Sequence, residues 1–341
     1  MASHTIGVFP ASGGIGGSTV KHLLPRFPAK DLVFVARNLA NLALASAAGA
    51  TVRQANYDDD KSLEHAFDGV ETLFLISYPS VEYEHRAEVS LRSFRRVPSI
   101  GEMATNLENL KRHRAAINFA LRSGVKYIFY GSLGFAGFTG SEANNETVAH
   151  VMRAHLDTEK YLEECRHQHP GFAYTVVREG LYSESYPLYT AFFDPNNPVD
   201  EIKIAHDGSG PGISWVKREE LGEGTAELLR IFAKEPKEFQ YRNSTVLLSG
   251  SRTWTLEETV DILAKIAKKP VKIRQVSDEE FAQQSQVPPN FTYRGVDLSK
   301  PWATAFEAFR QGEASVASPL LRELLGREPE DFETTISSYK V

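Results

Sequence analysis

The sequence has 341 residues, a formal net charge of −6 and a single cysteine. This length suits one large α/β domain with a smaller lobe, and the negative charge disfavours binding to nucleic acid or an anionic membrane surface. Cys165 alone excludes an intramolecular disulfide and a cysteine-based metal site. With no secretory segment near the N-terminus and no apolar stretch of membrane-spanning length, we expect a cytoplasmic protein.

The first half of the chain alternates short apolar runs with helical segments. Strands are expected at 5–9, 31–36, 51–54, 73–76, 127–130 and 174–177, and helices at 18–24, 39–48, 61–67, 107–122 and 150–166. Apolar strands that alternate with helices indicate a parallel sheet covered on both faces. The sequence therefore predicts an α/β fold with a Rossmann-type doubly wound sheet.

The pattern loosens after residue 177. Helices are expected at 217–231, 255–267, 278–284 and 320–325, and short strands at 244–249 and 271–275. Thr255 followed by Glu258 resembles a capping box at a helix start. We expect a Rossmann domain at 1–182 with an insertion at about 79–106. A smaller α/β substrate-binding lobe then covers 183–341, and its strand at 244–249 returns to the main sheet.

Two side-chain clusters have plain structural interpretations. The basic run Lys111-Arg112-His113-Arg114 is typical of the solvated face of a helix. His167 and His169 stand at a helix end without an evident third ligand, so we expect no metal site.

The stretch PASGGIGG, residues 10–17, lies between the first strand and the first helix. Gly13 and Gly16 have the spacing of dinucleotide-binding turns, although Pro10 stands where many such turns have glycine. Glycine allows a pyrophosphate to approach backbone N–H groups at a helix N-terminus, where the helix dipole favours negative charge. A tight turn without a ligand is the alternative, and the flanking strand and helix favour phosphate binding.

The end of the second strand bears on the choice of coenzyme. An Asp or Glu usually binds the adenosine ribose there, but this chain has Arg37 followed by Asn38. An arginine can bind a 2′-phosphate through a charge-assisted bidentate contact. The sequence therefore favours NADPH/NADP over NAD as the cofactor, with a plain surface arginine as the alternative.

Four segments resemble the NmrA-like family of atypical short-chain dehydrogenases/reductases, and most closely its type-2 NADPH:quinone oxidoreductase and triphenylmethane reductase branch. They are TVRQANYDDDKSLEHAFDGVETLFLIS, GVKYIFYGSL, HLDTEKYLEE and YTVVREGLYSESY. The resemblance implies an NADPH-binding Rossmann domain and a small C-terminal lobe, with the active site in the cleft between them.

The resemblance also implies roles for single positions. By position, the cofactor would be bound by Ser12, Gly13, Gly14, Ile15 and Gly16 at the pyrophosphate, Arg37 at the 2′-phosphate, Asn56 and Tyr57 near adenine, Ile76, Ser77 and Tyr78 at the nicotinamide-side ribose, and Ser132 and Leu133 near the nicotinamide. The family usually has Asp at position 56, often a neutral residue at position 179, and the branch often reads Ser-Glu-Asn over 183–185.

The usual tyrosine acid of short-chain dehydrogenases is absent, because Leu156 stands four residues before Lys160. The candidates for catalytic roles are His155, Lys160, Glu179 and Tyr182. The alternative for His155 is a buried structural histidine, and the alternative for Lys160 is a surface lysine. The alternative for Glu179 is an ion pair with Arg178.

Aromatic residues are dense in the segments expected at the carboxyl edge of the sheet, and Tyr78, Phe135, Tyr182 and Tyr186 are the candidates for substrate contacts. We expect an NADPH-dependent reductase of a quinone-like or other aromatic or polyketide carbonyl substrate, by hydride transfer. A non-catalytic NADP(H)-sensing regulator and a non-redox isomerase that retains the cofactor are the alternatives. The expected partner is a small aromatic substrate, and a homodimer stays open.

Overall fold

The computed structural model of the chain describes residues 4–78, 112–293 and 295–338. The chain divides into two compact units. Unit 1 comprises Met1–Ser132, Ala154–Val177 and Thr225–Val246, and unit 2 comprises Leu133–Arg153, Arg178–Gly224 and Leu247–Val341. The insertion expected at about 79–106 lies outside the described residues, and the expected domain boundary at residue 182 stays a prediction.

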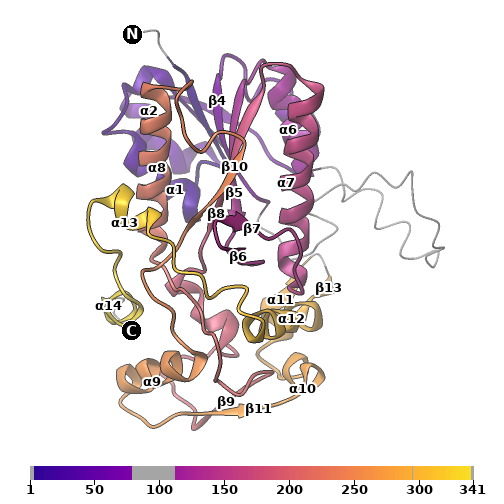
Figure 1. The fold of residues 1–341 in the computed structure, drawn as a ribbon, viewed down its shortest axis with the longest axis vertical. Coiled ribbons are helices and arrows are strands. Elements are labelled where there is room, and N and C mark those ends of the chain that lie inside the picture. The colour runs from indigo at the N-terminus through magenta and orange to yellow at the C-terminus, as the bar shows by residue number, and fades with distance from the viewer. Residues whose placement is uncertain (1–3, 79–111, 294, 339–341) are drawn as a thin grey trace, which may run out of the picture. The chain divides into compact units, whose positions relative to one another are not determined.

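A seven-stranded sheet is the central element of the fold (Figure 1). Its strands are β1 (Ile6–Phe9), β2 (Leu32–Ala36), β3 (Thr51–Gln54), β4 (Thr72–Ile76), β5 (Tyr127–Leu133), β8 (Ala173–Glu179) and β10 (Ser244–Leu248), in the order β10-β8-β5-β4-β1-β2-β3. The pairs β1–β2, β2–β3, β1–β4 and β4–β5 are parallel. The strand order reverses beside β1, which confirms the Rossmann-type doubly wound fold.

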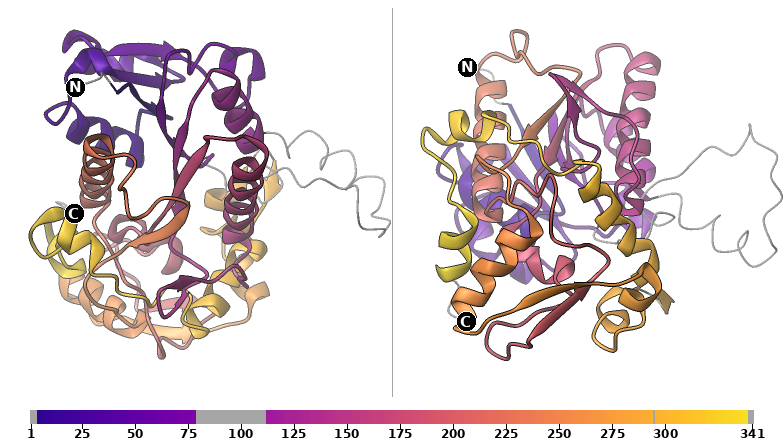
Figure 2. Two further views of the ribbon diagram at one scale, coloured as in Figure 1. Left: turned by 45° about the horizontal axis from the view of Figure 1, so that its top comes forward. Right: turned by 60° about the horizontal axis from the view of Figure 1, so that its bottom comes forward.

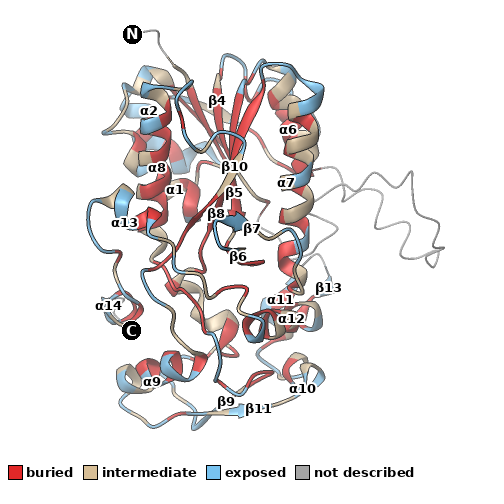
Figure 3. Cartoon of the chain, in the orientation of Figure 1, coloured by how far each residue is buried: buried red, intermediate tan, exposed pale blue. Residues whose placement is uncertain are grey.

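The inner strands are apolar because helices cover both of their faces. Every residue of β1 and β2 is buried, whereas the edge strand β3 has only half-buried and exposed residues. In Figure 3, the part of the sheet around β4 and β5 is coloured mostly as buried. The helices are α1 (Gly14–Leu23), α2 (Ala43–Ala47), α3 (Asp60–Leu63), α6 (Arg112–Arg122), α7 (His150–Gln168) and α8 (Arg218–Lys234). In Figures 1 and 2, α1, α2 and α8 lie on one face of the sheet, and α6 and α7 on the other.

Unit 2 is built from short elements around an aromatic core. The strands β9 (Glu201–Ile204) and β11 (Lys272–Gln275) form a parallel pair, and β6 (Phe138–Thr139), β7 (Glu142–Ala143), β12 (Thr292–Tyr293) and β13 (Val296–Asp297) form two small hairpins. The helices are α9 (Leu256–Ala267), α10 (Asp278–Ala282), α11 (Pro288–Phe291), α12 (Ser299–Arg310), α13 (Leu320–Leu325) and α14 (Phe332–Ser338). The Tyr189 ring packs on Trp215, Trp302 and Phe309, with ring centroids 5.2–5.6 Å apart.

Most expected elements are present within a few residues. The capping box is confirmed, because Thr255 Oγ1 accepts from the Glu258 N–H at 3.0 Å and the Thr255 N–H donates to the Glu258 carboxylate at 2.8 Å. The sequence pattern does not predict the strand β9 or the 3-10 helix Ser183–Tyr189. Within the described residues, no helix is both long and apolar enough to cross a membrane.

Candidate functional site

The glycine turn after β1 leaves the start of α1 open. Gly13 and Gly14 have φ values of 69° and 44°, and a Cβ added at either would meet nothing within 4 Å. The first turn of α1 contains no acidic residue, and no side chain caps it. At Gly16 a Cβ would lie 2.0 Å from the Pro10 carbonyl oxygen, so glycine is required for the turn to close. The result is a set of helix N-terminal N–H groups beside open space, as an anionic group needs.

Arg37 follows β2, the strand that pairs with β1. Its side chain is exposed and makes no hydrogen bond or ion pair with the residues of the described ranges. Its backbone is held, because Gln54 donates to the Arg37 carbonyl oxygen at 2.9 Å. Asn38 Oδ1 accepts from the Ala40 N–H at 3.0 Å and starts the following 3-10 helix. The cation is therefore available to a ligand on this edge of the sheet.

The loop after β3 holds Asn56 and Tyr57. Asn56 Oδ1 accepts from the Asp58 N–H at 3.2 Å, which shapes the turn. Tyr57 is buried, and its hydroxyl donates to the Ile76 carbonyl oxygen at 2.6 Å. Burial raises the pKa of Tyr57 well above its usual value, so this hydroxyl remains a donor. Tyr57 thus ties the β3 loop to the end of β4, and its contact with adenine stays a prediction.

The end of β4 contains a polar cluster that sequence reasoning missed. The Tyr78 hydroxyl donates to both Asp58 carboxylate oxygens at 2.9 and 3.1 Å, and Arg112 pairs with the same carboxylate. Arg112 also donates to the Tyr78 hydroxyl at 2.8 Å and lies over its ring. The Tyr78 N–H donates to His113 Nε2 at 2.7 Å. This cluster fixes Tyr78, while Ile76 and Ser77 remain half-buried beside it.

The interpretation of the basic run as a solvated helix face is therefore wrong for two of its residues. Arg112 and His113 are buried, and Lys111 lies outside the described residues. The physical reason is that a charged side chain can be buried when a carboxylate pairs with it, and here Asp58 does so. Asp58 lies far from Arg112 along the chain, so no local pattern could reveal the pair.

At the end of β5, Ser132 and Tyr130 contact two residues of α7. Ser132 Oγ donates to Glu159 Oε1 at 2.6 Å, and the Tyr130 hydroxyl lies 3.3 Å from His155 Nδ1. His155 is only 2% exposed, as expected for a buried structural histidine. Lys160 is exposed and makes no hydrogen bond or ion pair with any residue that the structure describes. The catalytic roles of His155 and Lys160 remain predictions.

The remaining candidates lie in unit 2. Arg178 is buried and donates to the carbonyl oxygens of Gly137 and Asn144 at 3.2 and 2.7 Å. Glu179 is also buried. Burial raises the pKa of Tyr182 well above its usual value, and the charge of Glu179 and a hydrogen bond to it act in the same direction. Burial and the neighbouring Glu179 carboxylate therefore both favour the protonated phenol of Tyr182.

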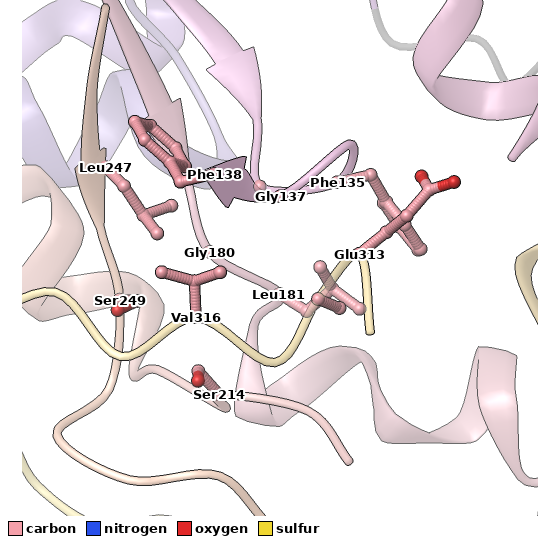
Figure 4. Close-up of a pocket in the computed structure, with 12 residues that line it drawn as sticks. Phe135, Gly137, Phe138, Gly180, Leu181, Ser214, Leu247, Ser249, Glu313 and Val316 are labelled. Carbon is pink, nitrogen blue, oxygen red and sulfur yellow. The ribbon is translucent and has the colours of Figure 1, made fainter. Parts of the chain in front are cut away.

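Unit 2 also contains a small cavity that is partly open to solvent. It is lined by Gly134, Phe135, Gly137, Phe138, Gly180, Leu181, Ser214, Leu247, Ser249, Glu313, Ala314 and Val316. Figure 4 shows Phe138, Leu247 and Val316 around it. The Ser214 hydroxyl is buried without a partner among the described residues. The cavity is smaller than the usual pocket for a drug-sized ligand.

The predicted substrate residues of unit 2 differ in exposure. Phe135 is buried and stacks on Phe309 at 5.6 Å, although it also lines the cavity. Tyr186 is half-buried and meets the Phe332 ring edge-on at 6.2 Å. Burial raises the pKa of Tyr186 to about 12.

Within the described ranges, no group of three or more His, Cys, Asp or Glu residues could hold a metal ion.

The strand order, the glycine turn and the exposed arginine define a dinucleotide-binding α/β protein. Residues 11–206 match the family model described as NAD(P)H-binding. The chain belongs to this NAD(P)H-binding family and, within it, to the NmrA-like group near the quinone oxidoreductase 2 and triphenylmethane reductase branch.

Relatives and solved structures support this membership over most of the chain. Quinone oxidoreductase 2 of Escherichia coli is 30% identical over 81% of this chain and 79% of that relative. An NmrA-like family domain-containing oxidoreductase of Aspergillus flavus is 27% identical over 94% of this chain and 89% of that relative. An NADPH-dependent quinone oxidoreductase of Escherichia coli, crystallised with NADPH, has a TM-score of 0.70 at 25% identity, over 98% of this chain and 99% of that chain. The Citrobacter sp. triphenylmethane reductase, crystallised with NADP(H), has a TM-score of 0.67 at 25% identity over the same shares.

Proposed function

We propose that the protein is an NADPH-dependent reductase of a quinone-like or other aromatic carbonyl compound. The observation that carries the proposal is the open glycine turn at Gly13 and Gly14 together with the exposed Arg37 guanidinium after the neighbouring strand. These groups fit a diphosphate and an additional phosphate. When bound, the reduced nicotinamide supplies the hydride.

The residues of unit 1 have defined tasks in this proposal. The N–H groups at the start of α1 bind the pyrophosphate, and Arg37 binds the 2′-phosphate of the adenosine ribose. The fixed Tyr78 borders the nicotinamide-side ribose, and Ser132 lies near the nicotinamide ring. This arrangement follows the general rule that a dinucleotide crosses the carboxyl edge of the sheet where the strand order reverses.

The aromatic substrate class is supported by the two relatives named for quinone and triphenylmethane reduction. It is supported also by half-buried aromatic side chains in unit 2, which include Tyr182 and Tyr186. A flat ring system needs such an apolar surface and few polar contacts. The Tyr182–Glu179 pair is the candidate for holding a proton beside the substrate, because the phenol stays protonated.

The experiment is a measurement of NADPH oxidation by the purified protein with a panel of quinones and triphenylmethane dyes. We expect turnover with at least one flat aromatic acceptor, and slower turnover with NADH. Tight NADPH binding without oxidation by any acceptor would contradict the reductase proposal.

A second candidate is a non-catalytic NADP(H)-sensing regulator. Two observations favour it: Leu156 replaces the usual tyrosine acid, and His155 is buried. In that case a partner protein binds one redox form of the loaded chain and not the other. If deuterium from labelled NADPH appears in a product, both the sensor and a non-redox isomerase are excluded.

A further inference from the structure

In the proposed function the adenosine lies on the β2 side of β1, so the carboxyl end of β5 belongs to the other half of the sheet. Arg37, which we assign to the adenosine side, follows β2, on one side of β1. β4 and then β5 lie on the other side of β1. A dinucleotide that crosses at the switch point therefore brings its nicotinamide half to the ends of β4 and β5. Ser132 is the next-to-last residue of β5 and is 5% exposed.

The contact between β5 and α7 is built from two matched pairs. Tyr130 and Ser132 are two apart on one face of β5, while His155 and Glu159 are four apart on one face of α7. The lower pair joins Tyr130 to His155 at 3.3 Å, and the upper pair joins Ser132 to Glu159 at 2.6 Å. The strand and helix repeats have similar lengths, so the register that buries His155 also presents Glu159 to Ser132.

The direction of the upper hydrogen bond decides what Ser132 can do. A serine hydroxyl has one hydrogen and two lone pairs, and an ionised carboxylate can only accept. Once the Ser132 hydrogen points at Glu159, only lone pairs of Oγ remain for a ligand. A charge-assisted bond of this kind is stronger than a neutral one, so the orientation is firmly held.

We propose that Glu159 is a positioning residue that fixes the Ser132 hydroxyl as a hydrogen-bond acceptor for a donor group on the nicotinamide half of the cofactor. The donors available there are the carboxamide NH2 and the ribose hydroxyls. This inference rests on the proposed function, because it assumes that the dinucleotide lies along the carboxyl edge. Glu159 acts through Ser132 and needs no contact with the cofactor.

The test is a double-mutant cycle on the full chain with Ser132→Ala, Glu159→Gln and the double variant. The glutamine keeps the shape of Glu159, but its NH2 can donate to Ser132 Oγ and occupy the lone pair. We expect each single variant to weaken NADPH binding by about tenfold in a calorimetric titration. The double variant should bind NADPH no more weakly than Ser132→Ala does, because the proposed role of Glu159 acts through the Ser132 hydroxyl. Ser132→Thr keeps the hydroxyl and, unlike Ser132→Ala, should bind NADPH as the wild-type chain does.

A truncated ligand separates positioning from a general structural effect. Adenosine 2′,5′-bisphosphate carries the adenosine half without the nicotinamide half, so its affinity should be unchanged in every variant of the cycle. Glu164→Gln, which alters a half-buried carboxylate on the same helix, is the matched control and should leave NADPH binding unchanged.

The outcomes also separate this inference from the proposed function. Suppose that the wild-type chain binds NADPH, but Glu159→Gln weakens NADPH binding equally in the wild-type and Ser132→Ala backgrounds, or also weakens the binding of adenosine 2′,5′-bisphosphate. The positioning role is then overturned and the proposed function stands. If neither single variant weakens NADPH binding, the positioning role is likewise overturned. If the wild-type chain takes up no NADPH, both are overturned together.

Discussion

The Arg37 guanidinium is exposed after β2 and meets no acceptor among the described residues. We expect Arg37→Asp to weaken NADPH binding by about 10- to 100-fold, because a charge-assisted contact with the 2′-phosphate is replaced by repulsion. NADH binding should change by less than about threefold, since it has no 2′-phosphate. Calorimetric titration of both coenzymes provides the measurement.

Lys30 supplies a control with the same change of charge. It is exposed just before β2 begins, at the end of that strand opposite to Arg37. Lys30→Asp should therefore leave the NADPH affinity as it is. Equal losses in the two variants would mean that net charge alone governs binding, and the assignment of Arg37 would be wrong.

Gly16 and Gly17 form a matched pair in the first turn of α1. A Cβ at Gly16 would lie 2.0 Å from the Pro10 carbonyl oxygen, whereas a Cβ at Gly17 would meet nothing within 4 Å. Gly16→Ala should lower the free energy of unfolding by about 2 kcal/mol or more, because the turn must shift. Gly17→Ala should raise it by up to about 1 kcal/mol, because alanine favours the helix.

Urea unfolding of the ligand-free protein measures both variants. Stabilisation by both substitutions would contradict the close approach of α1 to the Pro10 carbonyl group.

Glu313 holds the segment that connects β5 to α7. Its carboxylate accepts from the Ala136 and Val148 N–H groups at 3.1 and 2.8 Å, and from the Thr147 hydroxyl. Ala136 has a φ of 67°, which a non-glycine residue rarely adopts. Glu313 therefore holds a strained backbone segment that also lines the cavity of unit 2.

Glu313→Ala should lower the free energy of unfolding by about 3 kcal/mol, since buried N–H groups lose their acceptor. Glu307→Ala, on α12, removes a solvent-exposed pair with Arg310 and should cost less than about 1 kcal/mol. Chemical unfolding of the two variants provides the comparison. A cost for Glu313→Ala as small as that of the control would mean that water replaces the carboxylate in this loop.

We expect His206, which follows β9, to make the stability of the protein sensitive to pH. Its Nδ1 accepts from the Gly208 N–H at 2.9 Å, and the ring is buried. Burial lowers the pKa of His206, Arg310 lowers it further, and the Asp207 and Glu307 carboxylates oppose them. The unfolded chain therefore binds a proton on this side chain at a higher pH than the folded chain does.

The wild-type protein should accordingly lose stability as the pH falls below about 6.5, the usual imidazole value. His206→Asn keeps an acceptor for the Gly208 N–H but does not titrate, so it should lack this part of the loss. Urea midpoints of both proteins at pH 8 and pH 5.5 measure the difference. Parallel midpoints over this range would show that His206 does not contribute.

Across the whole fold, the strands and turns that can be predicted from the sequence are those that interactions between neighbouring residues determine. The apolar runs of β1, β2 and β4 predict a buried parallel sheet, and the glycines after β1 predict an open turn. The burial of Arg112 and the hydrogen bonds that Glu313 accepts could not be predicted, because the partners of both residues lie far away in the sequence. The Ser132–Glu159 bond likewise depends on the register between a strand and a helix.

We expect the turn at residues 12–16 and Arg37 to bind NADPH together. The most direct measurement is a calorimetric titration of the purified wild-type chain with NADPH and, separately, with NADH. We predict saturable uptake of NADPH at one site per chain, with NADH bound at least about tenfold more weakly. Absence of heat from both coenzymes at concentrations up to about 1 mM would mean that these groups do not form a coenzyme site.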